Sequence, residues 1–257
     1  MPTMPSNTHA WVINLDRSPE RLAVISAQLD ALGLPWTRHR AVDARALRPD
    51  QSALLDLPEF HRKHGMEPVP GEIGCYLSHI EVMQAFLASP HRFALILEDD
   101  ANLGPRLPPV LAELEACAER WDMVKLSAVH SGSPQTCLRL DDQCELAIMM
   151  SRCTGSSAYL ISRHAAEVYL SKLLPMSVPY DHAFDRGWAL GLKIRLVTPP
   201  PVGHPQDNAT TIITSGRRKF HWTRRWTTHL YRARNEIARI WWGLVELRQE
   251  RAYKNKA

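Results

Sequence analysis

Residues 10–43, AWVINLDRSPERLAVISAQLDALGLPWTRHRAVD, decide the fold that we expect. Ala10–Leu15 is short, apolar and rich in β-forming residues, as in a buried strand. A helix then begins at Pro19 and ends at Gly33. Its apolar face consists of Leu22, Ile25, Leu29 and Leu32. A second strand follows near Trp36–Val42, and a strand–helix–strand unit of this kind favours parallel strands joined by a right-handed crossover.

The same alternation of strands and helices continues to about residue 200. Further strands are expected at Phe93–Leu97, Trp121–Ser127, Ser156–Ser162 and Lys193–Thr198, and helices at Tyr76–Ala88, Val110–Arg120, Arg163–Leu174 and Asp181–Leu190. Residues 44–70 are expected to be irregular, and residues 130–150 to form a loop or hairpin. The pattern predicts an α/β fold with a Rossmann-like, mixed and mostly parallel sheet and helices on both faces. Ligands of such sheets bind beyond the carboxyl ends of the strands.

Charge is distributed unevenly along the 257 residues. A content of 45% hydrophobic and 23% charged residues is typical of a globular protein and excludes a wholly disordered one. From Arg217 onward there are twelve Lys and Arg but three Asp and Glu, whereas the preceding 216 residues are slightly acidic. We therefore expect a globular domain over residues 8–215 and a basic tail over residues 216–257.

The tail also holds four of the eight tryptophans, namely Trp222, Trp226, Trp241 and Trp242. Apolar residues recur at helical spacing, which predicts an amphipathic helix over His229–Glu250. Aromatic and basic residues together suit the headgroup region of an anionic membrane. A helix packed on the domain with solvated arginines is one alternative, and nucleic-acid binding is another.

The five cysteines are odd in number and form no CxxC pair, and the sequence does not open with a basic region and an apolar core like those of a signal peptide. The apolar runs, such as Phe93–Leu97, are too short to cross a bilayer. We therefore expect reduced thiols in a cytoplasmic protein, without disulfides or a zinc site.

Three carboxylates, Glu98, Asp99 and Asp100, directly follow an apolar strand. Alternate residues of an extended chain share a face, so Glu98 and Asp100 point one way and Asp99 the other. Clustered carboxylates repel one another, and a divalent cation such as Mg²⁺ or Mn²⁺ relieves that repulsion and can hold a diphosphate. The alternative is a solvated acidic turn.

Residues 71–79, GEIGCYLSH, place two glycines three residues apart beside the start of the helix predicted from Tyr76. Backbone amides at Gly74 and the helix start could face an anion. The alternative is a loop before a capped helix, with His79 as a hydrogen-bonded core residue. Cys75 has no His–Asp set nearby in the sequence that would indicate a nucleophilic thiol.

These motifs, in this order and spacing, resemble glycosyltransferase family 25. The residues that carry the resemblance are Asn14-Leu15-Asp16-Arg17 with Arg21, Ala41-Val42-Asp43, GEIGCYLSH at 71–79, LILEDD at 95–100, Gly155–Ser162 and Pro179-Tyr180-Asp181. The family contains bacterial lipooligosaccharide galactosyltransferases, with collagen galactosyltransferases as distant relatives. The likeness covers about residues 11–205, and the tail after Arg217 has no matching pattern.

The resemblance implies a GT-A type fold and an inverting galactosyltransferase that uses a UDP-sugar. Asp100, with Glu98 or Asp99, would hold Mn²⁺ or Mg²⁺ on the UDP diphosphate. His204 would complete the metal shell or touch phosphate, and a plain loop histidine is the alternative. The residues expected to bind the nucleotide sugar are Asn14, Leu15, Arg17, Asp43, Gly74, Ser78, His79, Glu98, Asp99, Gly155 and Ser156. Arg21 would touch phosphate or form a surface ion pair.

Inversion requires one displacement and a general base near the acceptor hydroxyl. Asp181 is the candidate, with Asp185 behind it, and the alternative role of Asp181 is a helix N-cap. The expected partners are a UDP-sugar, a lipid-linked oligosaccharide acceptor and an anionic membrane on the cytoplasmic side, without nucleic acid. The competing interpretations are another donor, a protein acceptor, or a non-catalytic sugar- or nucleic-acid-binding module with the same fold.

Overall fold

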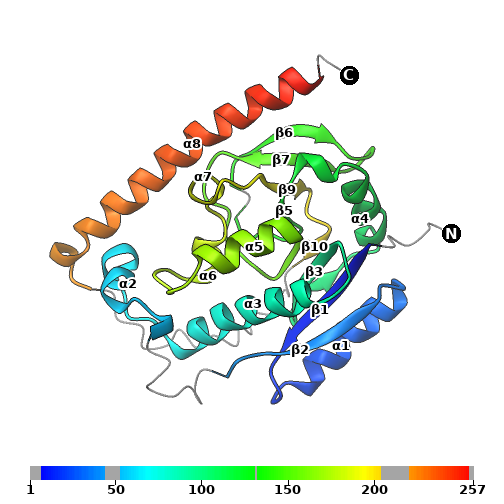
Figure 1. Ribbon diagram of the computed structural model, residues 1–257, viewed down its shortest axis with the longest axis horizontal. Coiled ribbons are helices and arrows are strands. Elements are labelled where there is room, and N and C mark those ends of the chain that lie inside the picture. The colour runs from blue at the N-terminus through cyan, green and yellow to red at the C-terminus, as the bar shows by residue number, and fades with distance from the viewer. Residues whose placement is uncertain (1–6, 44–52, 131, 204–219, 255–257) are drawn as a thin grey trace.

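A mixed eight-stranded sheet with the strand order β2-β1-β3-β8-β5-β9-β7-β6 forms the centre of the protein (Figure 1). The structure is a computed structural model that describes residues 7–43, 53–130, 132–203 and 220–254. The strands are β1 (Thr8–Asn14), β2 (Trp36–Arg40), β3 (Phe93–Glu98), β5 (Met123–Lys125), β6 (Pro134–Arg139), β7 (Glu145–Met149), β8 (Ala158–Ser162) and β9 (Ile194–Thr198). Strands β7 and β8 run against the other six. The sheet is therefore mostly parallel.

Helices cover both faces of this sheet. Helices α3 (Pro70–Ala88) and α5 (Arg163–Lys172) pack on one face, and α1 (Pro19–Ala31) and α4 (Leu107–Ala116) pack on the other. Neighbouring residues of β1 enter separate cores, because Trp11 packs with the first helix pair and Val12 with the second. This arrangement confirms the expected α/β fold class of the GT-A type.

The opening strand–helix–strand unit forms as its sequence predicts. Strands β1 and β2 are parallel, with Ala10 opposite Trp36. Ile25 and Leu29, which belong to α1, are fully buried against the sheet, and Gly33 follows the helix with a φ of +64°. The positive φ explains why glycine stands at this position.

Three predictions of local structure are wrong. Helix α3 begins at Pro70, six residues earlier than expected, because proline suits the first turn and the Glu72 carboxylate accepts the Val69 N–H at 3.2 Å. The stretch expected to be irregular contains α2 (Leu57–His64), which Asp56 caps by accepting the Glu59 N–H at 3.0 Å. The single helix expected over 181–190 is two short helices.

These short helices are α6 (Tyr180–Ala183) and α7 (Gly187–Leu190). The expected hairpin over 130–150 is present as β6 and β7. The remaining elements are β4 (Asn102–Leu103), which pairs with β10 (Val202–Gly203), and the 3-10 turns η3 (Ala118–Arg120) and η4 (Trp222–Arg224).

Helix α8 (Trp226–Lys254) lies along one side of the molecule, where it contacts α2, α7, the edge strand β6 and its neighbour β7 (Figure 1). A Cβ atom at Gly243 would lie 2.7 Å from Met150 Sδ, so the missing side chain lets the helix approach the sheet. The predicted tail helix is confirmed and is longer at both ends. The expected boundary between residues 215 and 216 lies outside the described residues.

Among the helices formed by the described residues, none combines the length and the apolar character required to cross a bilayer.

Candidate active site

Polar residues from three strands meet at the carboxyl end of the sheet. Strands β1 and β3 are parallel neighbours, with Ile13 opposite Glu98, so Asn14 and the acidic residues after β3 lie at the same edge. Strand β8 runs in the opposite direction beside β3, and Leu97 pairs with Ala158. The loop that precedes β8 therefore places Ser156 at this edge as well.

Glu98 is held from two sides. Ser156 Oγ donates to Glu98 Oε1 at 2.6 Å, and His79 Nε2 lies 3.4 Å from the same oxygen. The Glu98 backbone N–H also donates to the Ser157 carbonyl at 2.8 Å. The positive φ of Gly155, +100°, belongs to the turn that brings Ser156 to this position.

Asp99 and Asp100 have different surroundings. Asp99 accepts hydrogen bonds from Asn14 Nδ2 at 2.8 Å and from Arg21 Nη1 at 3.0 Å. Asp100 lies farther from that guanidinium, with 4.0 Å between its Oδ2 and Arg21 Nη1. Burial and the negative charge of Glu98 raise the pKa of Asp100 to about 6. An ion pair on the helix surface, with Glu20 or Asp16, was one of the two roles expected for Arg21, but its partner is Asp99 at the site, where only 20% of the Arg21 side chain is exposed.

Glu98 and Asp100 fit a divalent cation. Both offer carboxylate oxygens, both are half-buried, and their mutual repulsion is visible in the raised pKa of Asp100. Oxygen-only donors suit Mg²⁺ or Mn²⁺. His204, the third expected ligand, lies outside the described residues.

Asp181 joins this acidic group across the thiol of Cys75. Burial raises the pKa of Cys75 well above its usual value, and the charges of Glu98, Asp181 and Asp100 raise it further. Glu98 places a carboxylate oxygen within 4.8 Å of the Cys75 sulfur, and the charges of Asp181 and Asp100 also act on this side chain of α3. A neutral, buried thiol of this kind is a poor nucleophile, as expected.

Asp181 lies in the first turn of α6, and its side chain is 28% exposed. The residue at the N-cap of this helix is Pro179, so the alternative capping role of Asp181 is not observed. A half-exposed carboxylate that follows a rigid proline can reach a substrate.

A second group of possible ligands overlaps with the first. Among the described residues, Cys75, His79 and Glu98 each place one donor atom within 4.8 Å of the others. The i, i+4 spacing of Cys75 and His79 in α3 was the sequence signal for this group, and the sequence analysis did not use it. The raised pKa of Cys75 disfavours the thiolate that a metal requires, so the carboxylate pair fits better.

The GEIGCYLSH segment has an internal role in the structure. Gly74 and Ser78 lie within α3, so their amides belong to the helix and do not face a ligand, contrary to the prediction. Ser78 Oγ donates to the Gly74 carbonyl at 2.6 Å and accepts the Val42 N–H at 2.8 Å. This second bond fixes the segment that leads to Asp43.

His79 is fully buried, which agrees with the alternative prediction that it is a hydrogen-bonded core residue. Its ring stacks on Tyr180 at 4.0 Å, and Nδ1 lies 2.9 Å from the Tyr159 hydroxyl. The imidazole can orient the Glu98 carboxylate from the protein interior, but it cannot touch a nucleotide because it has no exposed surface.

Of the residues after β1 and β2 that were expected to bind the nucleotide sugar, some are buried in internal contacts and others are exposed. Asn14 is buried and links Asp99 to the Ser18 carbonyl, which its Nδ2 reaches at 2.9 Å. Leu15 is half-buried. Arg17 and Asp43 form an ion pair with both side chains over one-third exposed, and so remain open to a ligand.

Asp185 is not placed for catalysis. Its side chain is fully buried, binds Arg239 Nη1 at 2.9 Å and accepts the Cys153 N–H at 3.2 Å. This placement contradicts the catalytic role expected for it, because no acceptor hydroxyl can reach an oxygen that is enclosed in an internal ion pair.

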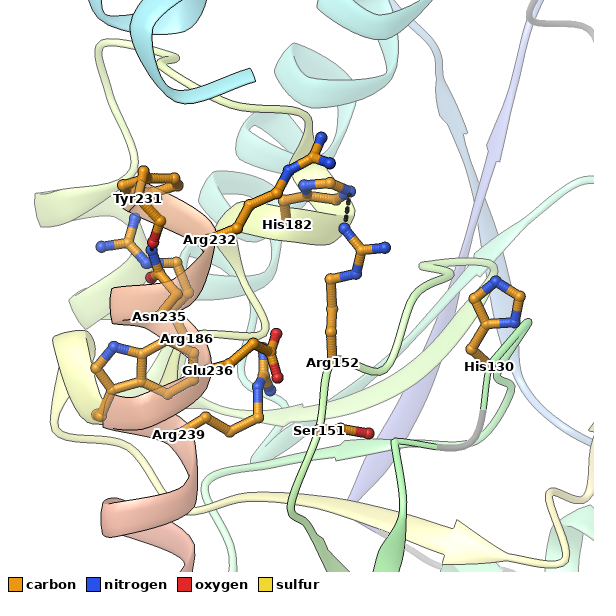
Figure 2. A pocket seen from close by; sticks show the side chains of 11 residues that line it. His130, Ser151, Arg152, His182, Arg186, Tyr231, Arg232, Asn235, Glu236 and Arg239 are labelled. Atoms are coloured by element: carbon orange, nitrogen blue, oxygen red, sulfur yellow. Dashed lines mark hydrogen bonds between the residues drawn. The ribbon is translucent and has the colours of Figure 1, made fainter. Parts of the chain in front are cut away.

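Sequence reasoning missed a set of arginines beside Asp181. Arg152, Arg186 and Arg232 come from two loops and from α8, and they meet only in the folded chain (Figure 2). They belong to no common sequence motif, and their spacing in the sequence does not indicate that they lie close together.

The family model for glycosyltransferase family 25, described as an LPS biosynthesis protein family, matches residues 7–184. The chain therefore belongs to glycosyltransferase family 25. It is 30% identical to a glycosyltransferase 25 family member of Aedes aegypti over 187 residues, which cover 68% of this chain and 30% of that one. It spans about a third of the length of this relative and of its Anopheles gambiae counterpart.

Two further relatives differ in length and description. A putative glycosyltransferase of Haemophilus influenzae is 23% identical over 90% of this chain and 84% of its own length. The human inactive glycosyltransferase 25 family member 3 is 29% identical over 45% of this chain and 21% of its own. Among solved structures, the inositol-1-phosphate CTP transferase of T. maritima matches 79% of this chain and 71% of its own, with 8% identity and a TM-score of 0.35.

Proposed function

We propose that the chain transfers a sugar, with galactose as the first candidate, from a UDP-sugar to a lipopolysaccharide or lipooligosaccharide acceptor. The observation that carries the proposal is the polar site at the carboxyl end of the sheet, where Ser156 and His79 hold Glu98 and where Asp100 follows in the same acidic turn. Membership of family 25, whose model is described by LPS biosynthesis, supports the acceptor class.

In this proposal Glu98 and Asp100 hold Mn²⁺ or Mg²⁺ against the UDP diphosphate. When bound, such an ion stabilises the negative charge that develops on the leaving group. Ser156 and His79 fix the Glu98 carboxylate, while Asn14 and Arg21 fix Asp99 and so the acidic turn. These contacts hold the site ready before the donor binds.

Asp181 is the proposed general base for an inverting displacement. It removes the proton of the acceptor hydroxyl as the acceptor oxygen bonds to the anomeric carbon. The bond between that carbon and the diphosphate oxygen breaks at the same time, and UDP leaves with the electron pair. Its partial exposure supports this role, as does the electrostatic influence on Cys75 that it shares with Glu98 and Asp100.

Helix α8 supports a membrane-bound acceptor. Its polar face packs on the protein, with Arg195 Nη2 lying 2.6 Å from Glu246 and 3.1 Å from Glu250. Several of its apolar residues face outward, among them Ile237 and Trp241, which are about 70% exposed. Exposed Arg234, Arg248 and Arg251 lie on the same helix.

The sequence left membrane contact and packing on the domain as alternatives for the tail. Packing is observed through buried ion pairs and through Tyr231 and Leu247, and it leaves Ile237 and Trp241 exposed. We propose that the protein binds peripherally to the cytoplasmic face of an anionic membrane through the exposed apolar and basic residues of α8.

The test of the proposed reaction is the release of UDP from UDP-galactose, with and without Mn²⁺. The wild type should release UDP only with the metal, and Asp100→Asn should abolish release while the circular dichroism spectrum stays unchanged. Asp142→Asn, which alters a fully exposed carboxylate, is the matched control and should behave as wild type. Full activity of Asp100→Asn in the presence of a chelator would exclude the metal role.

The second candidate function is a non-catalytic binding module, because one of the relatives is named as inactive. UDP bound in the presence of Mn²⁺, with no release from any of a panel of UDP-sugars offered with acceptors, would favour this module over the enzyme.

A further inference from the structure

A cavity of about 370 Å³ lies between α8, the α6–α7 segment, the loop before β6 and the loop after β7, and His182, the neighbour of Asp181, lines it (Figure 2). Its size falls at the small end of the range for ligand pockets and suits one sugar unit. The lining includes Arg152, Arg186, Trp188, Tyr231, Arg232 and His182. Figure 2 shows the arginines and His182 projecting from separate segments around the opening.

Positive charge dominates this cavity. Among the described residues, no carboxylate forms an ion pair with Arg152, Arg186 or Arg232. The buried Nε of Arg186 has no hydrogen-bond partner within the described part of the chain. Glu236 is the single acidic residue among those that line the cavity.

The arginines also repel one another. Burial lowers the pKa of Arg232, and the charges of Arg152 and Arg225 lower it further. Like charges gathered without balancing acids cost stability, and a bound anion removes that cost. Guanidinium groups recognise carboxylate and phosphate through paired hydrogen bonds.

The cavity adjoins the proposed base. Arg152 Nη1 lies 3.4 Å from His182 Nε2, and that nitrogen lies 3.9 Å from Asp181 Oδ1. A sugar whose charged group sits among the arginines therefore has its hydroxyls near Asp181.

We propose that this cavity binds the acceptor, and that the acceptor sugar carries a phosphate or carboxylate group recognised by Arg152, Arg186 and Arg232. The inference rests on the proposed function and narrows its substrate to an anionic saccharide. The arginines bind and orient the acceptor, and they take no part in proton transfer.

The test is direct binding, measured by isothermal titration calorimetry with glucose 6-phosphate, glucuronate, glucose and inorganic phosphate as probes. Wild-type protein should bind the two charged sugars, and Arg152→Gln and Arg232→Gln should each weaken that binding about tenfold. Arg139→Gln, which alters an exposed arginine of β6 that does not line the cavity, should bind them as wild type.

The inference would be contradicted if no charged sugar bound the wild type, if glucose bound as tightly as glucose 6-phosphate, or if the arginine variants bound the charged sugars as tightly as the wild type. Inorganic phosphate that binds as tightly as the sugar phosphate would indicate a site for free phosphate and would also overturn it. UDP binding with Mn²⁺, titrated in parallel, reports on the donor site, so a failure of the proposed function is recognised separately.

Discussion

Asp181 and Asp185 lie four residues apart, and the fold gives them opposite surroundings. Asp181 is partly exposed next to a cationic cavity and other carboxylates, whereas Asp185 is sealed in an ion pair with Arg239. The same chemical group can thus act on a substrate at one position and hold a helix at the other.

Asp181→Asn should lower the turnover of sugar transfer by about 10²–10⁴-fold, because an amide cannot accept the acceptor proton. The affinity for UDP with Mn²⁺ should change less than about twofold, since Asp181 does not touch the nucleotide in this account. Steady-state kinetics and calorimetry measure the two quantities. An unchanged turnover would exclude Asp181 as the base.

The sequence predicted the core of the site but not its supporting contacts. The place of Glu98, Asp99 and Asp100 at the end of an apolar strand could be predicted, but the extended alternation expected for them is wrong, because β3 ends at Glu98 and Asp99 and Asp100 lie in a turn. The positions of His79 and Ser78 could not, because they depend on where α3 begins and on distant Tyr159 and Val42.

At the scale of elements, α8 is attached through buried charges. Arg239 of α8 forms an ion pair with Asp185, and Glu246 and Glu250 of α8 form ion pairs with Arg195 of β9. Buried ion pairs add little over apolar packing, but the loss of one partner leaves an uncompensated charge. The helix is therefore sensitive to single substitutions on its inner face.

Asp185→Ala should lower the free energy of unfolding by about 3–5 kcal/mol, because the Arg239 guanidinium loses its buried partner. Urea denaturation followed by circular dichroism measures the change. Asp142→Ala removes an exposed carboxylate that also pairs with an arginine, and it should leave the midpoint unchanged. Equal midpoints for both variants would refute the anchoring role of Asp185.

Elements built from local patterns were predictable, and elements set by tertiary contacts were not. The β1–α1–β2 unit follows from its own apolar periodicity and its Pro19 and Gly33 signals. The break between α6 and α7 follows from the burial of Asp185 against Arg239, a residue 54 positions away. No window of sequence around residue 185 contains that information.

At the scale of the whole molecule, the two faces of α8 have different surroundings. Its inner face lines the cationic cavity through Arg232 and Arg239, while its outer face exposes Ile237 and Trp241. A membrane bound to the outer face would lie along the same helix that lines the proposed acceptor site.

Vesicle flotation tests the outer face. Wild-type protein should float with vesicles that contain phosphatidylglycerol and much less with phosphatidylcholine alone, because apolar burial and anionic lipid act together. Ile237→Ser combined with Trp241→Ser should abolish flotation. Val24→Ser, an exposed apolar residue of α1, should have no effect. Flotation of the double variant at the wild-type level would contradict membrane attachment through α8.

The central claim is that Glu98 and Asp100 hold the donor diphosphate through a divalent cation. Anomalous diffraction from crystals soaked with UDP and Mn²⁺ tests it most directly. The account predicts a manganese peak in contact with both carboxylates and with the UDP diphosphate. A peak between Cys75 and His79, or a nucleotide bound away from the carboxyl end of β3, would contradict it.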